Sequence, residues 1–118
     1  MHTVAEVRAA CAKLPGSTET FPFDATTLVF KVGGKVYALT DITAEPLPLS
    51  LKCDPAWAEQ LRADHAAITP GYHLNKRHWN TLILDGRLPS GLVSELLRHS
   101  YDLVTASLTR AQRADMGL

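Results

Sequence analysis

The sequence lacks an excess of charge of either sign. Lysine and arginine together number 12, aspartate and glutamate also number 12, and the formal net charge is therefore zero. This balance disfavours attachment to nucleic acid or to an anionic membrane through the overall field of the molecule. It leaves room for a local basic patch, because acidic residues elsewhere cancel such a patch in the sum.

Cysteines and long apolar runs are also scarce. Two cysteines, Cys11 and Cys53, are too few for a disulfide framework, and no signal peptide is recognisable. No apolar run approaches the roughly 20 residues that cross a bilayer. We therefore expect a soluble cytoplasmic protein with reduced thiols and no membrane contact.

What is present is an ordinary globular composition, with 118 residues that are 46% hydrophobic and 20% charged. A chain of this length forms one domain, here residues 1–118, and buries roughly two-thirds of the surface that it exposes when unfolded. Repeats, linkers and low-complexity segments are missing from the sequence.

The first segment predicts a helix. Thr3 and Glu6 have the spacing of a capping box, and Pro15-Gly16 ends the helix. An apolar stripe runs along it at helical spacing: Val4, Val7, Cys11 and Leu14. The next stretch, STETFPFDA, predicts a loop whose Phe21 and Phe23 plug the core.

Two runs rich in β-branched and aromatic residues flank Gly33-Gly34 and predict a hairpin with a two-residue turn. Lys31 and Lys35 flank its tip on opposite faces. The turn predicts three facing pairs: Val32 with Lys35, Phe30 with Tyr37, and Leu28 with Leu39.

The rest of the chain predicts three further elements and a second hairpin. In PLPLSLKC every second residue is leucine, and Pro48 points outward at an edge or an entry point of the sheet. Asp54-Pro55 begins a short helix, which buries Trp57 and Leu61.

A hairpin follows with a first arm from Ile68 to about Leu74, a turn at 75–77 and a strand over 78–84. A long helix covers 89–107, and the tail forms a helical turn. The predicted fold is an α+β two-layer sandwich, in the order α-β-β-β-α-β-β-α, with a mainly antiparallel sheet.

Motifs of common enzymes are missing. The sequence contains no G-x-S-x-G, no H-E-x-x-H and no glycine-rich phosphate loop. Potential nucleophiles are present at Ser50, Ser100 and Cys53. No sequence motif around them identifies a base that would activate them. We expect no enzymatic activity and no cofactor.

Metal binding is weakly indicated. His73 and His78 could meet across the second hairpin, with Cys53 or His65 beside them, but the sequence has no CxxC or HxxxH pair. We expect no metal site. The polar groups around Tyr72, His73 and His78 leave open a small-molecule or enzymatic site as a minor alternative.

Nucleic-acid binding has more support. One hairpin tip carries Lys31 and Lys35, and the other carries Asn75, Lys76, Arg77 and His78. Lysine and arginine contact phosphates, while asparagine and histidine add hydrogen bonds. We expect Tyr72 and Trp79 to belong to the framework, with Trp79 anchoring the hairpin to the last helix.

Four segments resemble the MmcQ/YjbR family: PGSTETFPF, LKCDP, PGYHLNKRHWNTL and SYDLV. The resemblance extends from the first helix to about Thr109. It implies an α+β fold similar to secretion-chaperone and frataxin-like sandwiches, and a bacterial "double-wing" DNA-binding motif. The two hairpins would be the wings. The candidate DNA contacts are then Lys31, Lys35, Asn75, Lys76, Arg77 and His78.

Two functional hypotheses follow. The first is a small DNA-binding protein that contacts phosphates with both tips. The alternative is a protein- or peptide-interaction module that adds a partner strand to its sheet. A contiguous positive face that joins the tips favours DNA, and an apolar groove favours a peptide.

Overall fold

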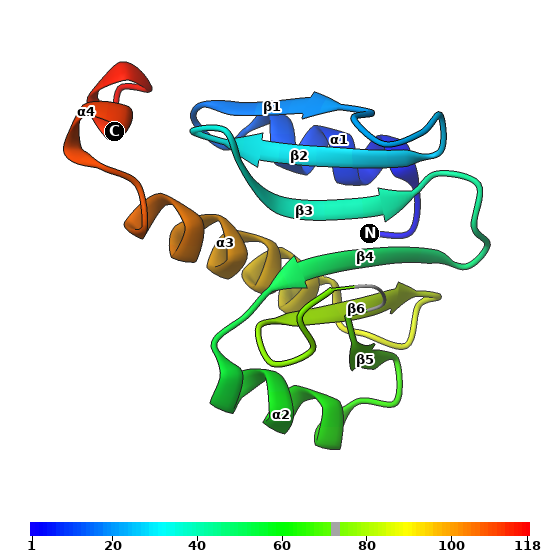
Figure 1. The fold of residues 1–118 in the computed structure, drawn as a ribbon. Helices are drawn as coiled ribbons and strands as arrows, with labels where there is room; N and C mark the ends of the chain where they lie inside the picture. The colour runs from blue at the N-terminus through cyan, green and yellow to red at the C-terminus, as the bar shows by residue number, and fades with distance from the viewer. Residues whose placement is uncertain (72–73) are drawn as a thin grey trace.

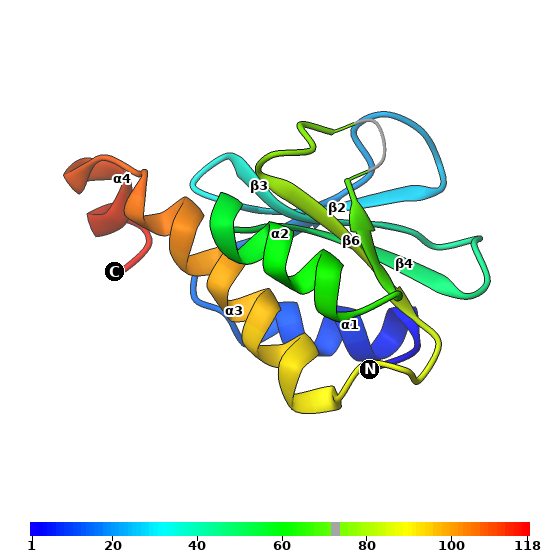
Figure 2. The same ribbon diagram turned by 90° about the horizontal axis from the view of Figure 1, so that it is seen from below.

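A computed structural model describes residues 1–71 and 74–118. Six strands form one sheet in the order β1-β2-β3-β4-β6-β5, and every neighbouring pair is antiparallel. Helices α1, α2 and α3 cover one face of this sheet, and the short α4 lies beyond the ends of strands β1 and β2 (Figures 1 and 2). The elements are α1 Val4–Ala12, β1 Ser17–Thr20, β2 Thr27–Val32, β3 Lys35–Asp41, β4 Leu47–Lys52, α2 Pro55–Asp64, β5 Ile68–Pro70, β6 Trp79–Leu84, α3 Ser90–Ala106 and α4 Arg110–Asp115.

This arrangement confirms the predicted α+β sandwich and the predicted succession of helices and strands. It adds one strand, β1, where a loop was predicted. The residues of β1 are polar and mostly exposed, so they show no apolar alternation, and the strand exists through its pairing with β2. None of the described helices is long and apolar enough to cross a membrane.

The helical signals identified in the sequence act as caps. The Thr3 side chain accepts a hydrogen bond from the amide of Glu6, and that of Asp54 accepts one from the amide of Trp57. Cys11 is buried on the stripe of α1, as predicted. In α2, Leu61 is buried as predicted, together with Ala58, whereas Trp57 is only half-buried.

Phe21 and Phe23 do not plug the core. They follow β1 in the loop that leads to β2, and their exposed fractions are 45% and 71%. The prediction was wrong because β1 runs along the edge of the sheet, so that the loop after it lies away from the helices.

The leucines of β4 are buried and alternate with half-buried residues, as predicted. Pro48 points away from the core, as predicted. Of the two places predicted for it, an edge or an entry point, the structure shows the second, because β4 begins at Leu47 and lies between β3 and β6. The pairing of β4 with β3 ends at Leu49, and the Pro48 carbonyl accepts a hydrogen bond from the Thr40 hydroxyl at 2.8 Å.

A bulge changes the register of the β2–β3 hairpin. Val32 faces Lys35, as predicted, but the pairing shifts between Phe30 and Lys31. Beyond that shift the predicted pairs were wrong: Phe30 faces Ala38, Val29 faces Leu39, and Leu28 faces Thr40. An extra residue in one strand moves later residues by one position, and a side chain that moves by one position changes face. Leu39 therefore points away from the helices.

The second hairpin is shorter than predicted. Its first arm, β5, ends at Pro70 and not near Leu74, and residues 71–78 connect it to β6. The amide of Gly71 donates to the Trp79 carbonyl at 2.8 Å and closes the paired region. Tyr72 and His73, on which the metal and small-molecule alternatives depended, lie outside the described residues.

Candidate binding groove on the open face of the sheet

The face of the sheet opposite the helices carries a groove of about 600 Å³. Two segments rise on this side: the connection from β1 to β2, and residues 74–78 before β6 (Figure 2). Strands β2, β3, β4 and β6 form the floor between them. The lining residues are Phe23, Asp24, Thr26, Thr27, Val36, Leu39, Thr40, Asp41, Pro48, Ser50, Leu74, Trp79 and Thr81.

The floor of the groove follows from strand pairing. Leu39 faces Ser50 across β3 and β4, and Ser50 faces Thr81 across β4 and β6. Paired residues share a face, so these three side chains form a row across the open side. The hydroxyls of Ser50 and Thr81 are 2.9 Å apart and hydrogen-bonded. The floor thus combines apolar side chains with hydroxyl groups.

Trp79 belongs to this groove and not to the core. It faces Lys52 on β4, on the open side of the sheet, and is half-buried. The prediction that Trp79 anchors the hairpin to the last helix was wrong, because α3 packs on the opposite face. The next residue, Asn80, points into the helical layer instead and is 2% exposed.

One end of the groove is acidic. The Asp24 carboxylate accepts hydrogen bonds from the amides of Thr27 and Thr26, at 2.7 and 2.9 Å, and these bonds lower its pKa. The hydroxyl and amide of Thr43 bind Asp41, at 2.7 and 2.9 Å, and lower the pKa of Asp41. Both carboxylates are therefore ionised at neutral pH.

These two carboxylates lie close enough that the charge of Asp24 acts on the pKa of Asp41. A backbone hydrogen bond of 2.9 Å from Ile42 to Thr26 holds the Asp24 loop against the end of β3. Neither carboxylate has a cationic partner within residues 1–71 and 74–118. The ion pairs of that part of the chain are Arg8–Glu19, Arg87–Asp85 and Arg98–Asp102.

The other end of the open face is basic. Lys31 faces Val36 and Lys52 faces Trp79, so both lysines share the open side with the groove residues that they face. They occupy the ends of β2 and β4, whereas Asp41 occupies the end of the antiparallel β3. The surface around the groove therefore changes from negative to positive along the strands.

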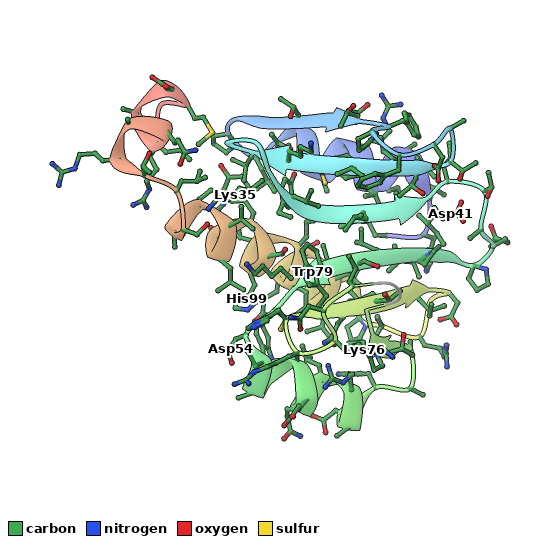
Figure 3. All side chains as sticks on the ribbon, in the orientation of Figure 1. Lys35, Asp41, Asp54, Lys76, Trp79 and His99 are labelled. Carbon is green, nitrogen blue, oxygen red and sulfur yellow. The ribbon has the colours of Figure 1, made fainter. Side chains whose placement is uncertain are left out.

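The residues predicted as DNA contacts lie in two separate places. Lys35 is on the helical side of its hairpin, where Nζ donates to the hydroxyl and the carbonyl of Ser107, at 3.2 and 3.4 Å. Lys31 is on the opposite side, as predicted. Figure 3 shows Lys35 beside the C-terminal part of α3 and Lys76 in the separate loop above α2. The two tips do not form one cluster.

Residues 75–78 form a hydrogen-bonded turn. The side-chain oxygen of Asn75 accepts a hydrogen bond from the amide of Arg77 at 2.9 Å. The backbone carbonyl of Asn75 accepts hydrogen bonds from the amides of His78 and Trp79. The His78 carbonyl accepts from the amide of Cys53 at 2.8 Å. These contacts give Asn75 and His78 structural roles, and they leave the side chains of Lys76 and Arg77 exposed.

Other polar residues in or next to the family-like segments join elements. Ser100 on α3 accepts from the amide of Lys52 at 2.9 Å and donates to the Tyr37 carbonyl at 2.6 Å. His99 accepts from the amide of Asp54 at 3.1 Å (Figure 3). Its ring packs edge-on against Trp57. Ser100, considered above as a nucleophile, is thus occupied by two backbone contacts.

The cysteines are poorly placed for chemistry. Burial raises the pKa of Cys11 and of Cys53 to about 11, so both thiols stay protonated at neutral pH. Within the described part of the chain, no three His, Cys, Asp or Glu residues are grouped as a metal site.

Sequence reasoning missed the groove. Its acidic end had a local signal, since Asp24 precedes Thr26 and Asp41 precedes Thr43 at the spacing of turns in which the aspartate accepts from the backbone. Its apolar part had none, because the bulge decides that Leu39 faces outward.

The YjbR family profile matches residues 12–103. The chain belongs to the YjbR family. It is 32% identical to the uncharacterised protein YjbR of Escherichia coli K12 over 111 residues, which cover 94% of each chain. It is 31% identical to the uncharacterised protein YbdF of Escherichia coli O157:H7 over 99 residues, or 83% of this chain and 80% of the relative.

Solved structures confirm the YjbR fold. The crystal structure of Deinococcus radiodurans protein DR2400, with a DUF419 domain, superposes with a TM-score of 0.95 at 56% identity and covers 100% of this chain and 90% of that one. A Pseudomonas syringae protein superposes with a TM-score of 0.73 at 25% identity, covering 86% of this chain and 97% of that one. Family membership thus fixes the fold, and the function is argued from the geometry.

Proposed function

We propose that this YjbR protein is a binding module that holds an extended peptide segment of a partner protein in the groove on the open face of its sheet. The observation that carries the proposal is the groove itself: about 600 Å³, with apolar side chains and hydroxyl groups on its floor and a loop on each side. Concave, partly apolar surfaces with a few fixed polar groups are the usual form of binding sites.

The dimensions suit a short extended chain. Thr27 and Lys31 are four positions apart on one strand beneath the groove, which corresponds to about 13 Å. An extended segment of about four residues covers the same length. Leu39, Trp79 and Leu74 offer apolar contacts, and the Ser50 and Thr81 hydroxyls offer hydrogen bonds.

A library of displayed random hexapeptides tests the proposal. We expect peptides enriched on the wild-type protein to bind at least tenfold more weakly to Ser50→Arg, because the long side chain fills the floor of the groove. The matched control is Ser94→Arg, which adds the same side chain at an exposed position of α3. Far-UV circular dichroism and thermal unfolding verify that both variants fold. Equal binding to all three proteins contradicts the proposal.

DNA binding is the second candidate, and the positions of four cations favour it. Lys31 and Lys52 lie on the open face, at the end of the sheet where β6 begins. The exposed Lys76 and Arg77 lie just before that strand. Four phosphate contacts would give a slope of about −3.6 for log affinity against log salt, and a loss of about a hundredfold between roughly 50 and 200 mM salt.

Fluorescence anisotropy of labelled duplex and single-stranded DNA tests this candidate. The variant Lys76→Ala/Arg77→Ala should lose affinity and show a shallower salt slope, while Arg110→Ala/Arg113→Ala on α4 keeps both. Unchanged affinity in the first variant removes these residues as the DNA contact.

A further inference from the structure

We infer that the groove selects a segment with a lysine or arginine, whose cationic group binds between Asp24 and Asp41. This inference rests on the proposed peptide-binding function and specifies its ligand. Its basis is charge complementarity within one cavity: both carboxylates line the groove, and neither is ion-paired with any residue that the structure describes.

Each carboxylate keeps room for a cation. Both hydrogen bonds from Thr43 go to Oδ1 of Asp41, and within residues 1–71 and 74–118 no side chain donates a hydrogen bond to its Oδ2. In Asp24, Oδ1 accepts from the two amides, and among the described residues Oδ2 accepts only a 3.2 Å bond from the Thr27 hydroxyl. The outer oxygens can therefore accept from an ammonium or a guanidinium group.

The backbone holds both carboxylates in place before a ligand arrives. Asp24 is bound by the amides at the start of β2, and Asp41 by the amide of Thr43 just after β3. A ligand that meets such fixed groups loses less conformational freedom on binding. The charge of Asp24 also acts unfavourably on that of Asp41, and a cation between the two carboxylates relieves this repulsion.

The rest of the groove suits the stem of a long basic side chain. Leu39, Pro48 and the exposed Phe23 line the cavity together with the carboxylates. Lysine and arginine cover apolar surface with their methylene groups while their charged ends reach polar groups. Lys31 and Lys52 disfavour a second basic residue at the far end.

The test uses the same hexapeptide library and three proteins: wild type, Asp41→Asn and Asp115→Asn. Asparagine keeps the oxygen that accepts from Thr43 and removes the charge. Asp115→Asn changes the net charge equally at an exposed position on α4, far in sequence from the groove. The best peptide from the wild-type selection is then synthesised with its basic residue and with glutamine in its place.

We expect the enriched peptides to carry lysine or arginine. The basic peptide should bind Asp41→Asn about tenfold more weakly than wild type, equivalent to about 1.4 kcal/mol, with no change for Asp115→Asn. The glutamine peptide should bind wild type and Asp41→Asn alike. In a second outcome, the peptides lack a basic residue, bind Asp41→Asn as tightly as wild type, and still lose affinity for Ser50→Arg. That result overturns this inference and leaves the proposed function standing. Failure of every peptide to distinguish wild type from Ser50→Arg overturns both.

Discussion

At the scale of single residues, β6 presents its tryptophan to the groove and its asparagine to the core. The buried Asn80 accepts a hydrogen bond of 2.8 Å from Arg62 and donates one of 3.3 Å to the Ala58 carbonyl, both on α2. A buried amide is tolerated when its polar atoms have partners, and here those partners belong to a different element. Asn80 therefore ties α2 to the sheet.

We predict that this tie contributes measurably to stability. Asn80→Ala should lower the free energy of unfolding by about 1–3 kcal/mol, because it leaves the Ala58 carbonyl without its side-chain donor and removes the shorter of the two hydrogen bonds that Arg62 donates, the other going to the Lys76 carbonyl. Urea unfolding of Arg62→Ala, Asn80→Ala and the double variant measures the coupling between the two residues. A coupling energy of about 0.5 kcal/mol or more is expected for residues in one network, and strict additivity would contradict it.

The sequence could not reveal which of Trp79 and Asn80 is buried. Hydrophobicity favours the tryptophan, and that prediction was wrong. Which side chains of β6 face inward depends on its register with β4, where Leu49 faces Leu82 inside the core. That register pairs Lys52 with Trp79 and Leu51 with Asn80, 27 and 29 positions apart, so no local pattern in NKRHWN encodes it.

At the scale of elements, the tip of the β2–β3 hairpin is docked on the end of α3. The nearest atoms to a Cβ placed on Gly33 would be the two Cδ atoms of Leu108, each at 2.7 Å, whereas a Cβ on Gly34 would meet nothing within 4 Å. Lys35 adds its hydrogen bonds to Ser107. A hairpin held in this way is part of the scaffold more than a free wing.

The two glycines of this turn offer a matched comparison. Both have positive φ, +59° at Gly33 and +77° at Gly34, so alanine at either position costs about 1–2 kcal/mol. Gly33→Ala should cost about 1 kcal/mol more than Gly34→Ala, because it also displaces the buried Leu108. Chemical denaturation measures both. The difference in stability between Gly33→Ala and Gly34→Ala should vanish when Leu108 is also replaced by alanine. If the difference persists in that background, Leu108 is not its cause.

Local patterns predicted most of the elements. The glycine pair identified the first hairpin, Asp54-Pro55 the start of α2, and alternating leucines the strand β4. They did not predict the bulge beside Lys31 or the strand β1, because both depend on pairing between strands. The groove depends on these two features, and it was missed with them.

At the scale of the whole molecule, zero net charge conceals an ordered distribution. Asp24 and Asp41 lie at one end of the strands, and Lys31, Lys35 and Lys52 lie at the other. If opposite charges in equal numbers were spread evenly over the surface, a partner would have no electrostatic preference for one orientation. Separated along the strands, they can orient a partner whose charges are arranged in the opposite sense.

The same charges predict how stability changes with pH. Hydrogen bonds from nearby amides and side chains lower the pKa values of Glu6, Asp24, Asp41 and Asp85 in the folded chain. Groups of this kind stabilise the fold above their unfolded pKa, which is about 4, and the stabilisation is lost as the pH falls through the lower folded value. The unfolding temperature should therefore fall below about pH 4, and less steeply in the variant Asp24→Asn/Asp41→Asn.

The buried thiols predict a second decline at high pH. Burial raises the pKa of Cys11 and Cys53 from 9.0 to about 11 in the folded chain. The folded state then binds more protons than the unfolded state between these values, so stability is complete below pH 9 and is lost as the pH rises towards 11. Thermal unfolding of wild type and Cys11→Ala/Cys53→Ala from pH 7 to pH 11 tests this under reducing conditions. The variant is less stable at every pH, because each alanine leaves a cavity. Its unfolding temperature should nevertheless decline less between pH 9 and pH 11, and parallel curves would assign the alkaline loss to groups other than the thiols.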